Sequence, residues 1–217
     1  GAILESGIKK VFVATTDPNP KHAGRGLGLL RNAGVAVELA DEPIQVRAER
    51  LNFIFNHNMR TGDPLIALKL AESSNGMVAE RSGQPSSVTG KEARADVMQW
   101  RRLFPAICVG SGTVLVDDPS LTSRLPDETW CPVRILTDSS LSTLAEGVSP
   151  RKVHVDEFSD RSIVLTTAKG MANAERVARA KEIGVRLIEV EESDGGGIDP
   201  SCLRSVLSEL NLHAVYC

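Results

Sequence analysis

The sequence predicts an α/β fold with a mostly parallel sheet. Short apolar segments of strand length alternate with longer amphipathic segments along the chain, and this alternation is typical of parallel strands connected by helices. Glycines follow two of the predicted helices, at Gly34 and Gly184, where a left-handed cap is expected. The chain has 217 residues, of which 41% are hydrophobic, so it is long enough to bury a core.

Two strands and two helices are predicted in the first part of the chain. They are strands at residues 8–14 and 35–39, and helices at residues 23–33 and from Pro43 onward, the second with an apolar stripe of Ile44, Ala48, Leu51 and Phe55. The run from Arg60 to Pro64 is rich in turn-forming residues. We therefore expect a first domain over residues 1–60 and a second over residues 61–217.

The second part of the chain continues the alternation. Its predicted strands are residues 65–71, 106–109, 133–137, 163–166, 185–190 and 213–216, and its helices run from Thr89 to Phe104, over residues 171–183 and from Pro200. Thr89 and Glu92 form a capping box at the start of the first helix. The helix stripe is Ala93, Val97, Trp100 and Phe104. Residues 191–197 are acidic and glycine-rich and are expected to form a surface loop.

Charge and cysteine usage exclude several classes of protein. Lys and Arg number 25 against 28 Asp and Glu, which gives a net charge of −3 and no basic surface for nucleic acid. No apolar stretch approaches the roughly 20 residues of a membrane span. The four cysteines are scattered, as expected of reduced thiols. We expect a cytoplasmic protein, although Gly1 leaves room for an upstream targeting segment such as a plastid transit peptide.

The run from Gly110 to Arg124 contains the residue types of a ligand site. A buried apolar strand leads into it, and its glycines predict a turn whose backbone N–H groups can approach a ligand closely. Thr113 adds a hydroxyl, Asp117 and Asp118 add carboxylates, and Arg124 adds a planar group suited to phosphate. Packing of a hydrophobic core does not require this combination of glycines, hydroxyl, carboxylates and guanidinium, so we predict a binding site here.

Several motifs in the second part of the chain resemble one enzyme family. They are Lys69-Leu-Ala, Asn75-Gly-Met-Val-Ala, Ser82-Gly, the run from Val88 to Val97, Arg101, and the run from Gly110 to Arg124. Together they closely resemble the reductase domain of the bifunctional riboflavin-biosynthesis deaminase/reductases. Upstream, the runs 7–11, 17–20, 22–26 and 32–37 resemble the end of the deaminase domain of the same family, and Met59 to Gly62 resembles the junction between the domains.

The resemblance implies a dihydrofolate-reductase-like reductase domain, preceded by the C-terminal α/β part of a cytidine-deaminase-like domain. In this family a zinc deaminase acts first, and an NADPH-dependent reductase then reduces 5-amino-6-(5-phosphoribosylamino)uracil to the ribityl phosphate. A zinc deaminase needs a His/Cys-x-Glu element and a Pro-Cys-x-x-Cys element. Neither is present, so we expect no metal ligand here and zinc only in a missing part of the deaminase domain. The family also implies a homo-oligomer formed through the reductase domain.

The resemblance implies catalytic roles for Lys69 and Asp117. Lys69 would contact the opened ribose and favour the carbon that accepts hydride, and the alternative is a lysine whose ammonium group reaches solvent. Asp117 would orient sugar or nicotinamide and assist proton transfer. Asp118 precedes a proline and is interpreted as a turn residue.

Binding roles follow from the same resemblance. Arg101, Leu121 and Arg124 are expected to bind the phosphorylated pyrimidine-ribose substrate, although Arg101 could also simply complement a helix dipole. The residues expected to bind NADPH are Ala71, Gly112, Thr113, Asp117 and Ser139.

The chain departs from the family pattern in three places. Asn75 stands where relatives have an aspartate, and Pro85-Ser-Ser replaces a Ser-Gln-Trp segment. Losing that indole removes stacking worth about 1 kcal/mol, and no role is carried over to Pro85 or Ser87. A Glu-Gly-Gly-Pro phosphate loop is expected after Cys217, where the sequence stops. We therefore expect the chain to be a fragment, and an isolated polypeptide of this sequence to bind NADPH weakly.

Two alternatives to an oxidoreductase remain open. The glycines Gly24, Gly26 and Gly28 with Asp41 resemble a Rossmann-type nucleotide site, but ten residues separate Ala14 from Gly24 and the turn is too long. A non-catalytic scaffold or regulatory homologue would explain Asn75 and the missing tryptophan.

Overall fold

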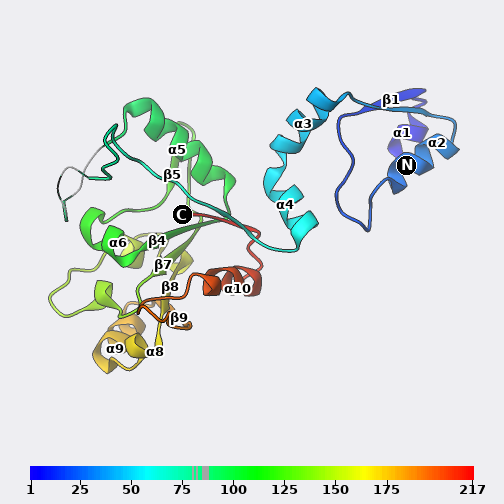
Figure 1. Ribbon diagram of the computed structural model, residues 1–217. Helices are drawn as coiled ribbons and strands as arrows, with labels where there is room; N and C mark the ends of the chain where they lie inside the picture. The colour runs from blue at the N-terminus through cyan, green and yellow to red at the C-terminus, as the bar shows by residue number, and fades with distance from the viewer. Residues whose placement is uncertain (80, 82, 85–87) are drawn as a thin grey trace. The chain divides into compact units, whose positions relative to one another are not determined.

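The computed structural model describes residues 1–79, 81, 83–84 and 88–217. Ser82 of the family motif and the departure at residues 85–87 lie outside the described residues. The chain divides into two compact units, Gly1–Leu65 and Ile66–Cys217. Figure 1 shows the helices and strands of each unit.

The first unit contains two parallel strands and four helices. They are α1 (Ala2–Glu5), β1 (Lys10–Val13), α2 (Arg25–Asn32), β2 (Ala36–Leu39), α3 (Glu42–Leu51) and α4 (Phe53–Thr61). The pairing of β1 with β2 is parallel, from Lys10↔Ala36 to Val13↔Leu39. The helix expected from Pro43 onward begins at Glu42, but it does not continue to Phe55, because Asn52 leaves the helical region at φ −117° and separates α3 from α4.

The first unit has almost no hydrophobic core of its own. Within residues 1–65, all of which are described, only Val35, Asn56 and Pro64 are buried. Phe12 and Leu51 are 70% and 83% exposed, so the expected apolar stripe of α3 is not covered inside this unit. Burial of apolar surface is the main favourable term in folding, and residues 1–65 contribute little of it to one another.

The second unit is built on a six-stranded sheet with the strand order β3-β10-β4-β7-β8-β9. Its strands are β3 (Leu65–Ala67), β4 (Ala106–Gly110), β7 (Val133–Thr137), β8 (Ser162–Thr166), β9 (Arg186–Glu189) and β10 (Ala214–Tyr216). The pairs from β10 to β9 are parallel. Cys217 accepts from Lys69 and donates to Ala67, as in a parallel pair. The predicted α/β fold with a mostly parallel sheet is confirmed.

Helices cover both faces of this sheet. The principal ones are α5 (Lys91–Leu103), α6 (Ser111–Asp117), α9 (Ala174–Glu182) and α10 (Ser201–Glu209). In Figure 1 the strands β4, β7 and β8 run between α6 on the left and α10 on the right. The connection through α10 returns from β9 at one edge to β10 in the interior of the sheet, and a right-handed return places α10 on the opposite face from α9.

The α10 face of the sheet holds the main hydrophobic cluster. The cluster consists of Ala106, Cys108, Ile135, Ile163, Leu165, Val206, Leu207 and Val215. Residues alternate between faces along a strand, so Arg134 and Leu136 of β7 lie on the other side of the sheet from Ile135. The partners of the buried Arg134 charge therefore have to lie on that second face of the sheet.

Three local predictions are corrected by the structure. The expected strand over residues 65–71 ends at Ala67, and Leu68 and Leu70 are 78% and 80% exposed because β3 is an edge strand. The N-cap of α5 is Gly90, without a side-chain cap bond, so the capping box at Thr89 is wrong. The expected helix over residues 171–183 begins only at Ala174, because Asn173 caps α9 by accepting from the Arg176 amide, and Met171 ends a separate short helix.

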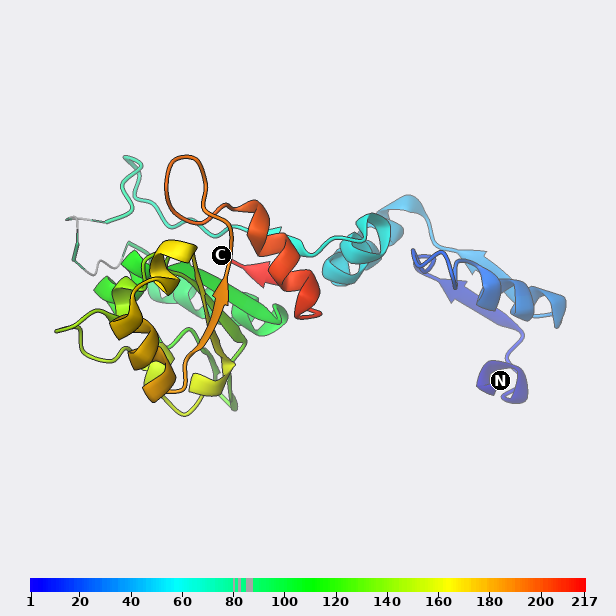
Figure 2. The ribbon, with the colours of Figure 1, turned by 90° about the horizontal axis from the view of Figure 1, so that it is seen from below.

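The acidic, glycine-rich segment at residues 191–197 is a surface loop, as expected, and it projects from the sheet in orange in Figure 2. Glu192 and Ile198 pair across its base. In the described part of the chain, no helix is both long enough and apolar enough to span a bilayer.

Substituting Gly170 with alanine is expected to destabilise the second unit by about 1–3 kcal/mol through overpacking. A Cβ at this position would overlap Thr166 Oγ1 and lie 2.7 Å from the carbonyl oxygen of Ser139. Gly112→Ala is the matched control, because a Cβ there has no neighbour within 4 Å. Urea unfolding of both variants measures the difference, and equal stabilities would contradict the packing at Gly170.

Acid is expected to destabilise the protein through His154. The side chain is fully buried, and neither ring nitrogen has a hydrogen-bond partner among the described residues. Burial lowers the pKa of His154 from 6.5 to about 4; Asp138 opposes this shift, and Arg134, Arg179 and Arg151 add to it. Between these two pH values His154 is protonated in the unfolded chain but neutral in the folded chain. The free energy of unfolding therefore falls as the pH drops from about 6.5 to about 4.

We expect the free energy of unfolding to be about 2 kcal/mol lower at pH 5 than at pH 7 from this group. His154→Leu should remove that part of the pH dependence. Urea titrations at the two pH values measure it, and an unchanged pH dependence in the variant would show that His154 is not the titrating group.

Candidate functional site

A cavity of about 680 Å³ lies beside the carboxyl end of β3. Its walls are the segment that follows β3, one side of α5, and the segment that follows α6. Six residues expected to bind substrate or cofactor or to catalyse line it: Lys69, Ala71, Arg101, Asp117, Leu121 and Arg124. Ligands in parallel α/β folds usually bind at the carboxyl ends of strands, so this is the first candidate site.

The motif from Gly110 to Arg124 begins with a helix rather than a glycine turn. Gly110 is the N-cap of α6, with φ −78° and ψ 159°, and the helix continues to Asp117. The buried Val114 packs into the second unit and stabilises this helix. The expectation of a backbone loop around the glycines is therefore wrong. Gly112 and Thr113 are exposed in the first turn of α6 and line neither cavity described here.

Asp117 and Asp118 have different surroundings. Asp118 ends α6 with φ 41°, and its Oδ1 accepts from the Lys152 amide at 2.8 Å while its Oδ2 lies 3.5 Å from Lys152 Nζ. Asp117 is exposed and lines the cavity, and no other described residue pairs with its carboxylate. Asp118 is therefore occupied by a structural contact, whereas Asp117 is available to a ligand.

Two arginines in the cavity lie close enough to repel each other. Burial lowers the pKa of Arg101, the charge of Arg124 lowers it further, and Tyr216 opposes both. Arg101 Nη1 donates to the Thr122 carbonyl at 3.1 Å, and its buried Nε has no partner among the described residues. Arg124 Nη1 lies 3.5 Å from Ser120 Oγ. Neither guanidinium pairs with a carboxylate of the residues that the structure describes, and two such groups favour binding of an anion such as phosphate.

The cavity as a whole is rich in positive charge. Lys69, Arg94, Arg101, Arg124 and Lys152 line it, against the two carboxylates of Asp117 and Asp118. Neither Arg94 nor Lys152 was identified from the sequence. Arg94 lies within a motif of the resemblance, but Lys152 is 34 residues from its partner Asp118, and no local pattern reports such a contact.

A second cavity of about 450 Å³ lies at the carboxyl ends of the central strands. Hydroxyl groups of Ser111, Thr137 and Ser139 line it together with Leu68 and Leu203. Ser139 is held in place because its carbonyl accepts from the hydroxyls of Thr166 and Thr167, at 3.1 and 3.0 Å. The residues expected to bind the cofactor are thus divided. Ala71 and Asp117 line the first cavity, Ser139 lines the second, and Gly112 and Thr113 line neither.

Comparison with known proteins decides the family. Residues 64–210 match the RibD C-terminal domain. The chain belongs to the RibD family. Its sequence is 42% identical over 164 residues to the riboflavin biosynthesis protein RibD of Bacillus amyloliquefaciens, covering 73% of this chain and 44% of that protein. The RibD protein of Aquifex aeolicus is 36% identical over 187 residues, which cover 86% of this chain and 49% of that protein.

Solved RibD structures match nearly the whole chain. Acinetobacter baumannii RibD aligns with a TM-score of 0.73 and 30% identity, covering 99% of this chain and 56% of that one. A Thermotoga maritima structure, described as a diaminohydroxyphosphoribosylaminopyrimidine deaminase/5-amino-6-(5-phosphoribosylamino)uracil reductase, aligns with a TM-score of 0.74 and 28% identity, over 99% of this chain and 55% of that one. The chain spans about half the length of these relatives.

The family resemblance noted from the motifs is therefore confirmed. The second unit is homologous to the reductase domain of the RibD proteins of riboflavin biosynthesis.

Proposed function

We propose that the RibD C-terminal domain of this chain reduces 5-amino-6-(5-phosphoribosylamino)uracil to its ribityl phosphate, with NADPH as the reductant. The observation that carries this proposal is the first cavity, which gathers Lys69, Asp117, Arg101 and Arg124 from three separate segments. Such a cavity offers an anion-binding end and the Asp117 carboxylate, which pairs with no other described residue. The homology to RibD proteins supports the same substrate class.

The phosphate of the substrate is assigned to Arg101 and Arg124. The charge of Arg124 lowers the pKa of Arg101 after the larger effect of burial, so a dianion between the two groups would relieve their repulsion. The partnerless Nε of Arg101 is a donor that such a ligand can satisfy. Leu121 is buried beside these groups and provides an apolar contact for the substrate.

The second cavity fits a nicotinamide cofactor. The hydroxyls of Ser111, Thr137 and Ser139 can bond to polar groups of the cofactor, and Leu68 and Leu203 can contact a flat ring. Leu68 lines this cavity and its neighbour Lys69 lines the first one, so one short segment borders both. When bound, NADPH supplies a hydride.

The chain's own residues would bind the substrate and manage one proton. Reduction adds a hydride to the C1 carbon of the opened ribose and a proton to the attached nitrogen. Asp117 is assigned to proton transfer at that nitrogen, because its carboxylate is free in the cavity. Lys69, whose backbone N–H is fixed by the Cys217 carbonyl at 2.7 Å, is assigned to the ribose oxygens, where its positive charge makes C1 more electron-poor.

The first unit is proposed to be the C-terminal end of the RibD deaminase domain, with the domain boundary near residue 60. The solved RibD structures cover 99% of this chain, and so include this unit. From the missing deaminase sequence elements, zinc is expected only in a part of the deaminase domain outside this chain. Among the described residues, no cluster of three potential metal ligands is present. A homo-oligomer formed through the reductase domain and a cytoplasmic location stay predictions from the family.

Titration of the full-length protein with NADPH tests the proposed cofactor. We expect saturable binding that weakens when Ser139 is changed to a bulky residue, as in Ser139→Phe. Absence of binding would favour the non-catalytic scaffold, and binding that survives removal of residues 61–217 would favour the Rossmann alternative at Gly24 to Gly28.

Arg124→Ala is expected to raise KM about 10- to 100-fold, because a hydrogen bond to a charged group contributes about 1.5–3 kcal/mol. Arg102→Ala is the matched control. Arg102 is on the same helix as Arg101, but it pairs with Glu128 at 2.9 Å and lies over Trp130, outside the cavity. Steady-state kinetics measure both variants, and equal effects on KM would remove Arg124 from the phosphate site.

A further inference from the structure

The cavity segment Asp118–Leu121 has an unfavourable backbone conformation at both of its ends. Asp118 has φ 41° and Leu121 has φ 56°, values that residues other than glycine rarely adopt. A backbone of this kind persists only where surrounding contacts hold it in place. The segment leads directly into Arg124, so whatever holds it also determines where the proposed phosphate ligands lie.

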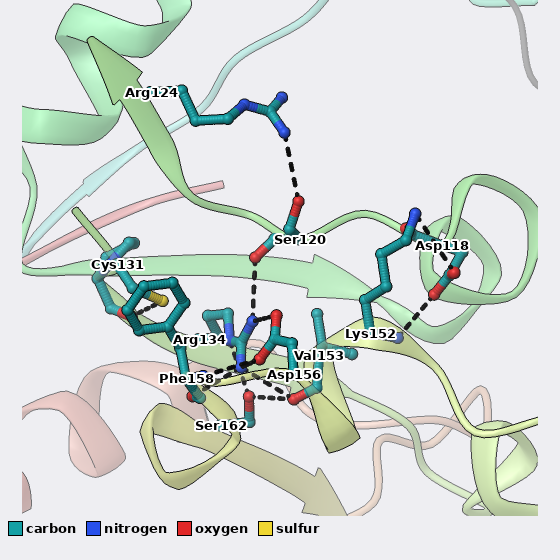
Figure 3. A network of polar contacts seen from close by, with 11 residues as sticks. Asp118, Ser120, Arg124, Cys131, Arg134, Lys152, Val153, Asp156, Phe158 and Ser162 are labelled. Carbon is teal, nitrogen blue, oxygen red and sulfur yellow. Dashed lines mark hydrogen bonds and ion pairs between the residues drawn. The ribbon is translucent and has the colours of Figure 1, made fainter. Parts of the chain in front are cut away.

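The buried Arg134 provides such a contact from below the segment (Figure 3). Its side chain is fully buried, and Nη1 donates to the Ser120 carbonyl at 3.0 Å. The same guanidinium forms a two-pronged ion pair with Asp156, at 2.7 and 2.8 Å. It also donates to the carbonyls of Val153 and Phe158 and to Ser162 Oγ, at 3.1, 2.7 and 2.8 Å. All three nitrogens of the group are therefore engaged.

A second contact is made at Asp118, the first residue of the segment, by the helix that also carries Val153. Lys152 and Val153 belong to α7 (Lys152–Val155). The Lys152 amide donates to Asp118 Oδ1, while the Val153 carbonyl accepts from Arg134. Figure 3 shows Arg134 between the chain at Ser120 and the segment that carries Val153, Asp156 and Phe158. Arg134 thus joins the cavity segment to α7 and to the turn after it.

Ser120 connects this network to the proposed phosphate site. Its carbonyl is bound by Arg134, and its hydroxyl lies 3.5 Å from Arg124 Nη1. Thr122, two residues further, accepts from Arg101. A shift of Ser120 would therefore move the partners of both cavity arginines.

We infer that Arg134, held by Asp156, is a positioning residue for substrate binding, which fixes Ser120 and thereby the two arginines of the phosphate site. Arg134 does not line the cavity, and it acts only through this segment. The inference rests on the proposed function for the identity of the ligand, but the contact with the segment can be tested without turnover.

The guanidinium geometry explains why a lysine cannot replace Arg134. A lysine carries one ammonium group and cannot form two parallel bonds to Asp156 while also reaching Ser120, Phe158 and Ser162. Arg134→Lys keeps the charge and most of the side-chain volume, so it removes mainly the geometry. Asp156→Asn is a milder second variant, because its amide keeps the shape and one acceptor.

The experiment measures amide hydrogen exchange at Asp118 and residues 120–122, since Pro119 has no amide proton, and the affinity for ribose 5-phosphate in the full-length protein. We expect Arg134→Lys to speed exchange in the segment at least about 10-fold and to weaken ribose 5-phosphate about 10-fold, a difference of about 1.4 kcal/mol. NADPH affinity should not change, because none of the described residues of this network lines the second cavity. Asp156→Asn should also speed exchange in the segment and weaken ribose 5-phosphate binding. It provides the same test if Arg134→Lys does not fold.

Arg179→Lys is the matched control. Arg179 is a partly buried arginine that donates to two carbonyls, those of Ala145 and Val148, and neither of these described partners belongs to the cavity segment. It should leave both readouts unchanged.

Unchanged exchange at Asp118 and residues 120–122 in the Arg134 and Asp156 variants would overturn the inference, and so would equal losses of ribose 5-phosphate and NADPH affinity, which indicate general loosening. If the unsubstituted protein does not bind ribose 5-phosphate, the phosphate site fails, and exchange alone then decides whether Arg134 holds the segment.

Discussion

Asp117→Asn is expected to lower kcat for the proposed reduction by about 100- to 10,000-fold, the usual contribution of general acid–base catalysis. An amide keeps the size of the side chain but cannot exchange a proton with the substrate nitrogen. Because Asp117 is exposed and no other described residue pairs with its carboxylate, folding should not change. Steady-state kinetics, with thermal unfolding as a check on the fold, measure the effect.

Asp127→Asn is the control for this variant. Asp127 is exposed in the turn between β5 (Ser123–Leu125) and β6 (Glu128–Trp130), and it does not line the cavity. It should keep normal kcat. A normal kcat in Asp117→Asn would assign proton transfer to another group and leave Asp117 with no more than a binding role.

Asp156→Ala is expected to lower the free energy of unfolding by about 3–5 kcal/mol, because it leaves the buried Arg134 charge without its partner. The Arg134 side chain is fully buried and that of Asp156 is 21% exposed. Burial alone would raise the pKa of Asp156, but its hydrogen bonds with Arg134 and the positive charge there hold that pKa below 3.8. The ion pair therefore stabilises the fold above about pH 3.8 and is lost as the pH falls further.

Glu128→Ala breaks a comparable but exposed pair and gives the contrast. Its partner Arg102 is 43% exposed, and exposed ion pairs contribute about 0–1 kcal/mol. Urea unfolding at neutral pH compares the two variants. Equal losses would mean that burial does not make the Arg134–Asp156 pair more important than a surface pair.

Much of the fold could be predicted because its signals are local. Alternating apolar runs and helix stripes identified the strands and the parallel arrangement, and every strand of the six-stranded sheet overlaps an expected range, with β4 and β8 each one residue longer at one end. Errors arose where neighbours in space decide the outcome. The run from Leu65 to Ala71 is apolar enough for a buried strand, but β3 is at the sheet edge and Leu70 is exposed. Gly110 and Gly112 suggested a turn, but packing of Val114 stabilises a helix.

The candidate site was predictable only where it is contiguous in sequence or matched by family motifs. Lys69, Arg101 and Asp117 were identified in this way and lie in one cavity. Lys152 and Asp156 could not be identified, because their partners Asp118 and Arg134 are 34 and 22 residues away. Arg134 did carry a usable signal. A charged residue inside an otherwise apolar strand must have buried partners. This predicts a polar network around Arg134 but does not identify the other residues in it.

Transfer of deuterium from NADPH deuterated at nicotinamide C4 tests the central claim most directly. The account predicts that the full-length protein, given 5-amino-6-(5-phosphoribosylamino)uracil, places one deuterium on C1 of the ribityl chain, and that Arg124→Ala slows this transfer at low substrate concentration. NADPH oxidation that does not depend on the substrate, or a product without deuterium at C1, would contradict the account.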